Sequence, residues 1–426
     1  MNDLALSLKI LNNVINKEAK SNEEINKFAH DANNLGFVTR VVYGVLENKI
    51  YLDYMIRKLS SVRLKKIHDE VLIILEIGFY NIHFLNTKDY AIVNELVDLT
   101  KKVNFKSAGF VNGILRNFIR DEDEIAKIKE SDDIKSLSIR YSLPEEITRY
   151  IYDNYGMDYT KNFLRYINTE PVLTIRVNNL KTNRKALKDL LEARGYDISE
   201  GTISENALRV ANPAGLAATT EFKNGLFTIQ QESSMKTIEV LDPKAGTKVL
   251  DLCAAPGTKT SYIGEYTNNE AAIIANDIIK EKLPLISENI NRLGLTNIEL
   301  TSFDANEFVS AYENAFDYVI VDAPCSGLGV MGRKPEIRYN RSIEDIRTLA
   351  SLQRDILDQA IKYVKQGGIL VYSTCTIGNL ENQANLAYLK DKADLEIDMI
   401  DGKEYIEYAN FLDETDGFFI SRFKKK

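Results

Sequence analysis

Small residues and carboxylates recur where the apolar runs of the C-terminal half end. The run 249–252 is followed by a short turn with one lysine, Cys253-Ala254-Ala255-Pro256-Gly257-Thr258-Lys259. Small side chains let the backbone approach a ligand, but the glycine patterns of dinucleotide and Walker-type phosphate sites are both absent. Aspartates end or follow the next three runs: Asp277, Asp304 and Asp322. Carboxylates at successive strand ends suit a cationic nucleoside, so we predict an S-adenosylmethionine site with Asp277 on the ribose hydroxyls.

Two cysteines lie in polar turns that follow later apolar runs. Cys325 lies in Asp322-Ala323-Pro324-Cys325-Ser326-Gly327, and Cys375 lies in Ser373-Thr374-Cys375-Thr376. Carbon 5 of a pyrimidine can accept a methyl group once a thiolate has added at carbon 6, and a second thiol can assist the later elimination. Asp322 is suited to hydrogen-bond the ring nitrogen of the base. Position alone does not rank the two thiols.

Alternating strand and helix patterns surround these residues. Apolar runs at 248–252, 271–275, 298–300, 318–321 and 369–372 alternate with helical patterns at 259–266, 279–293, 349–364 and 381–390. This alternation predicts a mostly parallel sheet covered on both faces, with two late strands near 395–400 and 418–423 at one edge. Residues 226–426 are therefore expected to form an α/β Rossmann-like domain whose strand ends gather the turn, the aspartates and the thiols.

The first 225 residues predict two further modules. In residues 1–125, apolar residues recur at three- and four-residue spacing, which indicates an all-α bundle with Val71–Ile77 near its centre. An acidic stretch including 121–124 and Glu130–Asp133 follows. Residues 126–225 then read as linker helices and a small α/β module, with a strand at 171–178 and a helix at 184–194.

The charge distribution limits where nucleic acid can bind. The net charge is −8, and residues 227–426 carry 22 basic and 31 acidic side chains. An RNA contact must therefore use a local patch. Basic residues gather between residues 165 and 194, and we expect Arg176, Arg184 and Lys188 to contact RNA, with an ordinary solvated helix face as the alternative.

Several classes of protein are disfavoured by what the chain contains. We find no signal-peptide pattern or membrane-spanning run, and the three cysteines form no C-x-x-C pair. We therefore expect a cytoplasmic monomer with neither a disulfide framework nor a metal site. The three histidines lie at positions 30, 68 and 83, which excludes a histidine-based hydrolase in the C-terminal half.

The motifs at 251–260, 322–327 and 373–376 together resemble the RNA 5-methylcytosine methyltransferase family. Residues 89–99 and 110–117 resemble the NusB family of RNA-binding helical domains. The combination is similar to the branch that methylates bacterial small-subunit ribosomal RNA. The resemblance implies S-adenosylmethionine as cofactor, ribosomal RNA as partner and carbon 5 of a cytosine as target. It also implies Cys375 as nucleophile, Cys325 in product release, and cofactor contacts from 253–259, Asp277, Asp304 and Asp322.

The chain departs from the family pattern at two positions. Thr258 replaces a glycine, and Gln231 replaces an aspartate; neither change removes a group that the chemistry needs. Three other functions stay open: a DNA enzyme using the Pro-Cys thiol as nucleophile, a tRNA enzyme, and a non-catalytic RNA-binding or ribosome assembly factor. The last predicts loss of a catalytic thiol, yet both thiols are present. Transfer to free small molecules would leave the first 226 residues without a role.

Overall fold

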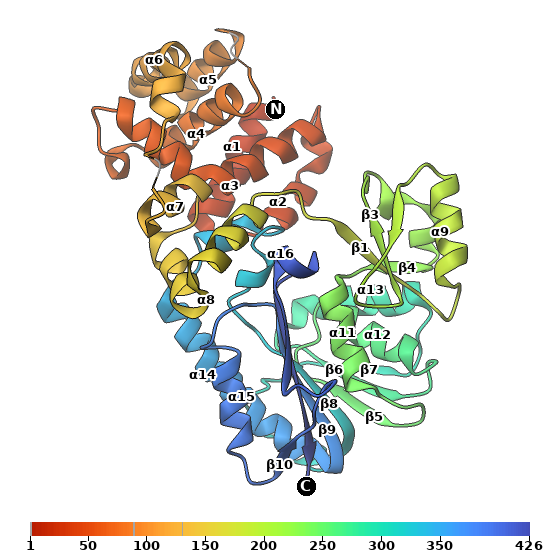
Figure 1. Ribbon diagram of the computed structural model, residues 1–426. Coiled ribbons are helices and arrows are strands. Elements are labelled where there is room, and N and C mark those ends of the chain that lie inside the picture. Colours follow the sequence, from red (N-terminus) through yellow and green to blue (C-terminus); the bar gives the residue numbers. More distant parts are fainter. Residues whose placement is uncertain (1, 88–89, 130) are drawn as a thin grey trace. The chain divides into compact units, whose positions relative to one another are not determined.

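The computed structural model describes residues 2–87, 90–129 and 131–426, which form two compact units (Figure 1). Unit 1 comprises Met1–Thr169 and Met331–Ser342, and unit 2 comprises Glu170–Val330 and Ile343–Lys426. The chain thus passes between the units three times, after residues 169, 330 and 342. The divisions expected after residues 125 and 225 stay predictions, and the segment 331–342 was not expected to leave the catalytic half.

Unit 1 is helical, and its core is built around α4. Its helices are α1 (Asp3–Lys17), α2 (Ser21–Lys27), α3 (Leu35–Leu59), α4 (Asp69–His83), α5 (Tyr90–Val103), α6 (Ala108–Ala126), α7 (Ile134–Tyr141) and α8 (Glu145–Tyr166). Apart from its first turn and its last residue, nearly every residue of α4 is buried, which confirms the central place predicted for Val71–Ile77. Asp89, in the NusB-like motif, and Glu130, in the acidic stretch, lie outside the described residues.

The segment 331–342 packs within unit 1 through the short 3₁₀ helix η8 (Pro335–Arg338). The fully buried Arg338 guanidinium donates to the backbone oxygens of Glu47 at 2.8 Å and Ile167 at 2.6 Å. Glu336 accepts a 2.9 Å hydrogen bond from the Ser21 hydroxyl. A stretch that follows the Pro-Cys motif in sequence is therefore part of the helical core.

A small antiparallel sheet opens unit 2. Its strands are β1 (Leu173–Val177), β2 (Ile198–Glu200), β3 (Ala207–Val210) and β4 (Phe227–Ile229), in the order β2-β3-β1-β4. Helix α9 (Arg184–Ala193) packs Leu187 and Leu191 against the sheet core. The short helix α10 (Thr220–Lys223) precedes β4. The fourth strand thus comes from beyond residue 225, in the segment that the sequence assigns to the catalytic domain.

The larger sheet of unit 2 is mixed. Its strands are β5 (Lys248–Asp251), β6 (Ala272–Asn276), β7 (Ile298–Thr301), β8 (Phe316–Asp322), β9 (Val364–Thr374), β10 (Leu395–Ile397), β11 (Tyr405–Tyr408) and β12 (Phe418–Lys425). The order is β10-β12-β9-β8-β5-β6-β7, with β11 on β12; β5 to β9 pair in parallel and β12 is antiparallel to its neighbours. Strand order reverses at β5, and ligands bind at the carboxyl ends beside such a point.

Helices cover both faces of this sheet, as Figure 1 shows. They are α11 (Glu232–Leu241), α12 (Thr258–Tyr266), α13 (Leu283–Leu293), α14 (Ile343–Tyr363) and α15 (Gln383–Lys390). The one-turn helix α16 (Asn410–Asp413) follows β11. Alternation along the strands explains the two faces: Leu250 packs towards α14 and α15, whereas its neighbour Val249 packs towards α11 and α12. Among the described residues, no helix is both long and apolar enough to cross a membrane.

Candidate active site

The turn 253–257 connects β5 to α12 and requires glycine at its last position. Gly257 has φ of 93°, in the left-handed region, and a Cβ there would lie 2.9 Å from the Ile286 side chain. The amide of Ala254 donates to the Asn276 carbonyl at 2.8 Å, which ties the turn to the end of β6. A ligand can therefore approach the backbone of this turn closely, and the family resemblance implies that the cofactor binds there.

The strand-end carboxylates meet this turn. Asp277 accepts hydrogen bonds from the backbone amides of Ala255 at 3.1 Å and Ile279 at 2.9 Å. Asp322 accepts one from Lys259 Nζ at 2.7 Å and one from the Ser373 hydroxyl at 2.8 Å. The structure therefore joins the ends of β6, β8 and β9 to the predicted cofactor turn.

Four aspartate side chains lie near the thiol of Cys253 and affect its pKa. Its pKa is raised well above the usual value, first by burial and then by the charges of Asp251, Asp322, Asp277 and Asp304. Asp304 caps its own loop by accepting from the Asn306 amide at 2.9 Å. Among the described residues, no group of three or more His, Cys, Asp or Glu side chains is arranged to hold a metal ion.

The two other thiols are in contact. Cys325 follows β8, Cys375 follows β9, and their sulfur atoms lie 3.2 Å apart. The pKa of Cys325 is raised well above its usual value, chiefly by its hydrogen bond to Cys375 and then by burial. Neighbouring parallel strands thus bring together two turns that are about fifty residues apart in sequence.

Two buried polar residues of the site were not identified from the sequence. Asn276 donates to the carbonyls of Leu252 and Phe303, both at 3.1 Å, and so holds three strand ends together. Glu381 accepts a 2.8 Å hydrogen bond from the Ser326 amide, directly after Cys325. The only sequence signal for Asn276 is an amide at the end of an apolar run, and Glu381 reads as an ordinary helix start.

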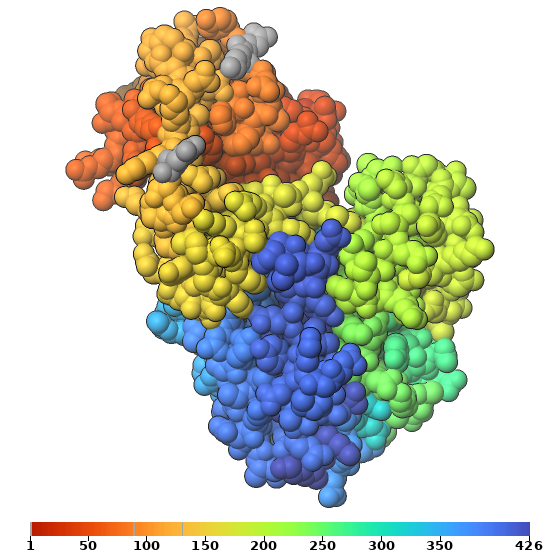
Figure 2. Space-filling view, in the orientation of Figure 1, coloured from red at the N-terminus to blue at the C-terminus, as the bar shows by residue number. Residues whose placement is uncertain are grey.

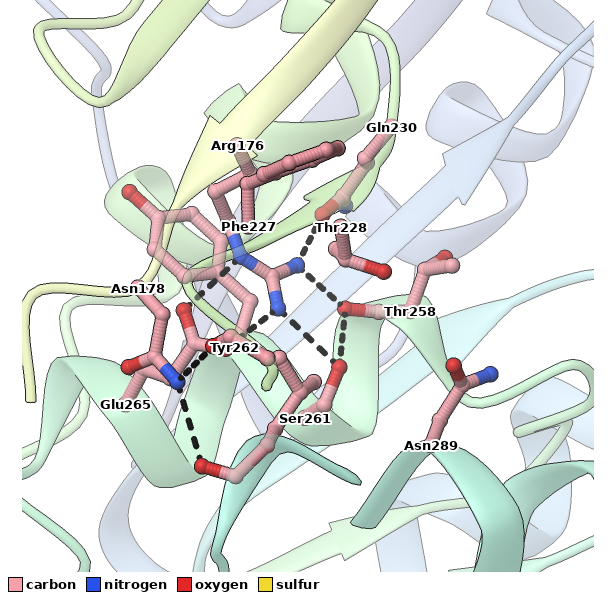
Figure 3. Close-up of polar contacts among 12 residues, drawn as sticks. Arg176, Asn178, Phe227, Thr228, Gln230, Thr258, Ser261, Tyr262, Glu265 and Asn289 are labelled. Carbon is pink, nitrogen blue, oxygen red and sulfur yellow. Dashed lines mark hydrogen bonds and ion pairs between the residues drawn. The ribbon is translucent and has the colours of Figure 1, made fainter. Parts of the chain in front are cut away.

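The structure corrects the role expected for Arg176. Its side chain is fully buried, and its guanidinium forms a bidentate ion pair with the Glu265 carboxylate, with N–O distances of 2.8 and 3.0 Å (Figure 3). It also donates to the Thr258 carbonyl at 2.7 Å, to the Ser261 hydroxyl at 3.1 Å and to Gln230. Arg176 therefore joins β1 to α12, the helix that begins at the cofactor turn, and is not exposed to RNA.

Arg184 and Lys188 lie on α9, and their side chains are each 31% exposed. The small module to which they belong appears in yellow-green on the surface of unit 2 (Figure 2). Arg184 pairs with Glu200 at 2.6 Å, and Lys188 lies 3.8 Å from Glu192. Contact of Arg184 and Lys188 with RNA stays a prediction, and a phosphate would compete with these carboxylates for both side chains.

Fold and site together define a Rossmann-like methyltransferase. Three family models match: 16S rRNA methyltransferase RsmB/F at residues 238–424, the NusB family at 1–120, and the ferredoxin-like domain of RsmF/B-like methyltransferases at 143–217. The chain is 36% identical to the probable ribosomal RNA small subunit methyltransferase B of Bacillus subtilis, over 92% of this chain and 91% of that protein. The chain therefore belongs to the RsmB/F family of small-subunit ribosomal RNA methyltransferases.

Solved structures confirm the predicted architecture. The crystal structure of PH0851 has a TM-score of 0.81 at 24% identity, covering 100% of this chain and 99% of that one. The structure of NSun6 from Pyrococcus horikoshii with SFG has a TM-score of 0.61 at 25% identity, covering 66% of this chain and 98% of that one. The all-α NusB-like bundle, the small α/β module and the methyltransferase fold are thus as the sequence predicts.

Proposed function

We propose that this protein transfers a methyl group from S-adenosylmethionine to carbon 5 of a cytosine in small-subunit ribosomal RNA, through a covalent bond between Cys375 and carbon 6. The observation that carries the proposal is the 3.2 Å contact between the Cys375 and Cys325 sulfurs beside Asp322. The relatives named as ribosomal RNA small subunit methyltransferases support the choice of RNA.

The residues present fit the cofactor. The turn 253–259 offers a backbone that can be approached closely, because Gly257 lacks a Cβ, and Asp277 places a carboxylate against the turn at Ala255. Asp304 and Asp322 add negative charge near the same turn. S-adenosylmethionine, when bound, supplies an electrophilic methyl group on a positively charged sulfur.

The chain's own groups then perform two tasks on the base. The Cys375 thiolate forms a bond to carbon 6, and the displaced electron pair makes carbon 5 nucleophilic enough to take the methyl group. Asp322, oriented by Lys259 and Ser373, passes a proton from the Lys259 ammonium to the ring nitrogen that receives this charge. Water then takes the carbon 5 proton, and the electron pair of that C–H bond restores the double bond and expels the Cys375 thiolate, to which Cys325 donates a hydrogen bond.

The raised pKa of Cys325 supports this division of labour. A sulfur that keeps its proton can donate a hydrogen bond to a thiolate 3.2 Å away, and it is the weaker nucleophile of the pair. The family resemblance implies the same order, and we assign attack to Cys375 and release to Cys325.

Replacing each thiol separately tests the assignment. Cys375→Ala is expected to form no covalent bond to RNA, because the attacking sulfur is gone. Cys325→Ala should still attack and transfer one methyl group, then stall as a denaturant-resistant adduct on a gel. The reverse pattern would indicate a DNA-type mechanism, and no adduct in either variant, with no methyl transfer by the wild type, would indicate a binding factor.

A further inference from the structure

Glu381 is a fully buried carboxylate whose partners are Ser326, in the turn after β8, and Gln353, on α14. Its Oε1 accepts from the Ser326 amide at 2.8 Å and from Gln353 Nε2 at 2.9 Å, and its Oε2 accepts from the Ser326 hydroxyl. Burying a charged group is unfavourable unless strong hydrogen bonds compensate, and amide and hydroxyl donors to a carboxylate are of that kind.

The same contacts extend to both cysteine turns. The Ser326 hydroxyl lies 2.7 Å from the Thr376 hydroxyl, and Thr376 directly follows Cys375. Gln353, on α14, also donates to the Pro324 carbonyl at 3.0 Å, directly before Cys325. The residues on either side of Cys325 are therefore fixed by one network centred on Glu381 and Gln353.

The side chain of Gln353 is itself fixed by hydrogen bonds from Tyr372 and Asn385. The Tyr372 hydroxyl donates to Gln353 Oε1 at 3.0 Å, and Asn385 Nδ2 donates to the same oxygen at 2.8 Å. Tyr372 also donates to the Glu381 backbone carbonyl at 2.6 Å. Gln353 therefore holds the side chain of Glu381, and Tyr372 holds its backbone. A residue that positions a catalytic group needs this kind of support.

We propose that Glu381 is a positioning residue that holds the Cys325 turn, and that it governs product release while leaving the attack by Cys375 unaffected. This inference rests on the proposed function, in which Cys325 assists the expulsion of Cys375. Because Glu381 bonds Ser326 through both its amide and its hydroxyl, loss of the carboxylate frees the turn that carries the Cys325 sulfur.

The negative charge of Glu381 also supports the role of Cys325, because it raises the pKa of that thiol. The pKa of Cys325 is raised first by its hydrogen bond to Cys375, then by burial, and then by electrostatic interaction with Cys375, Glu381 and Asp322. Asp322 is itself paired with Lys259. Tyr372, from β9, also interacts electrostatically with Cys325. A negative Glu381 keeps Cys325 in its thiol form, which is the form that can donate a proton.

The test uses the full chain, S-adenosylmethionine and unmodified small-subunit ribosomal RNA transcript. Glu381→Ala removes the acceptor, and Ser326→Ala removes one of its donors while the Ser326 amide still donates to the carboxylate. In both variants we expect a first turnover close to one methyl per enzyme, a steady-state rate lowered about tenfold or more, and accumulation of the covalent adduct. Glu404→Gln, at a partly exposed ion pair with Lys390, is the matched carboxylate control and should behave as wild type.

Rescue separates positioning from a merely structural role. Glu381→Gln has the same shape, and its amide can donate to Ser326 while that hydroxyl turns towards Thr376, so it should restore steady-state turnover towards wild type. The inference is overturned if the first turnover and the steady state fall together, or if Glu381→Gln is as slow as Glu381→Ala.

A second measurement does not depend on the thiol order. In a Cys375→Ala background, alkylation of Cys325 by iodoacetamide should become several-fold faster in Glu381→Ala and stay unchanged in Glu404→Gln. An unchanged rate in Glu381→Ala overturns the positioning role. The two tests can also give different answers. If Cys325→Ala forms no adduct with RNA, the proposed order of the thiols is wrong. If alkylation of Cys325 is nevertheless faster in Glu381→Ala, the positioning of Cys325 by Glu381 still holds.

Discussion

Asp251 ends β5 beneath the cofactor turn, and its carboxylate is fully buried. It accepts a 2.6 Å hydrogen bond from the Thr260 hydroxyl, yet burial and the nearby Asp322 raise its pKa to about 6. The folded state therefore holds this proton more tightly than the unfolded state, where the value is near 3.8. Stability is expected to fall as the pH rises from about 4 through about 6, and to stay level above that range.

Asp251→Asn tests this linkage. An amide keeps the bond from Thr260 and carries no charge, so the variant should lose this pH dependence. Its free energy of unfolding should exceed that of wild type by an amount that grows from about pH 4 to about pH 6 and reaches roughly 2–3 kcal/mol. Urea unfolding across this range measures the difference; parallel curves for the two proteins would contradict the assignment.

Asp277 is the residue through which cofactor recognition is best tested. Asp277→Ala removes the proposed acceptor for the ribose hydroxyls and the acceptor for the Ala255 amide, so binding of S-adenosylmethionine should weaken by about 1–3 kcal/mol. Calorimetry measures this, with Asp398→Ala, which removes the partner of Arg422 on β12, as control. An affinity equal to wild type would remove Asp277 from the site.

Residues at strand ends were predictable, whereas residues that meet others across the fold were not. Asp277 and Asp322 follow apolar runs, and parallel topology brings such ends together. Arg176 looked like part of a basic patch because its partner Glu265 is 89 positions away in sequence, on another element. Glu381 had no signal for the same reason, since its partner Ser326 precedes it by 55 positions.

At the scale of elements, β1 and α12 are joined through Arg176 and Glu265. Both side chains are almost wholly buried, and the guanidinium also lies 4.6 Å from the centre of the Tyr262 ring. Burial raises the pKa of Glu265, and Arg176 opposes that shift. The small sheet is thus fixed to the helix whose N-terminus borders the cofactor turn.

Arg176→Ala is expected to be strongly destabilising. It leaves the buried Glu265 carboxylate unpaired, at a cost of about 3–5 kcal/mol. Arg184→Ala, which breaks a partly exposed pair with Glu200, should cost about 1 kcal/mol or less and is the control. Equal melting temperatures for these two variants would show that the ion pair between Arg176 and Glu265 contributes little to stability.

The face of α9 that carries Arg184 and Lys188 is the remaining part of the proposed RNA patch. Replacing both by Gln should weaken RNA binding and reduce the magnitude of the salt slope by about 1–2, because fewer counterions are released. Filter binding at several salt concentrations measures both quantities. Unchanged affinity and slope would show an ordinary solvated helix.

Elements with regular patterns were predicted closely, and irregular pairings were not. The runs at 248–252 and 271–275 became β5 and β6 within a residue or two. Strands β4 and β11 were not predicted, because three or four residues carry no record of their pairing partner. Strand identity is local, but pairing depends on long-range contacts.

At the scale of the whole molecule, the chain returns to unit 1 after the Cys325 turn. Residues 331–342 leave unit 2 at Val330 and rejoin it at the start of α14. Within unit 1, Arg338 is fully buried and donates to oxygens of α3 and of the residues after α8. Those partners lie 171 to 291 positions earlier, so neither composition nor periodicity could place this segment.

This connectivity predicts how the catalytic half behaves alone. A truncated chain of residues 170–426 retains 331–342 but lacks the helices that bury Pro335 and Arg338, and burial lowers the pKa of that guanidinium. We expect it to aggregate, because the apolar side chains of Met331 and Pro335, which are buried within unit 1, become exposed. Replacing 331–342 by a Gly/Ser linker of equal length should restore a monodisperse protein that binds S-adenosylmethionine. Size-exclusion chromatography and calorimetry compare the two proteins. If the simple truncation is equally monodisperse, the segment has no need of unit 1, and its buried arginine must find other partners within the catalytic half.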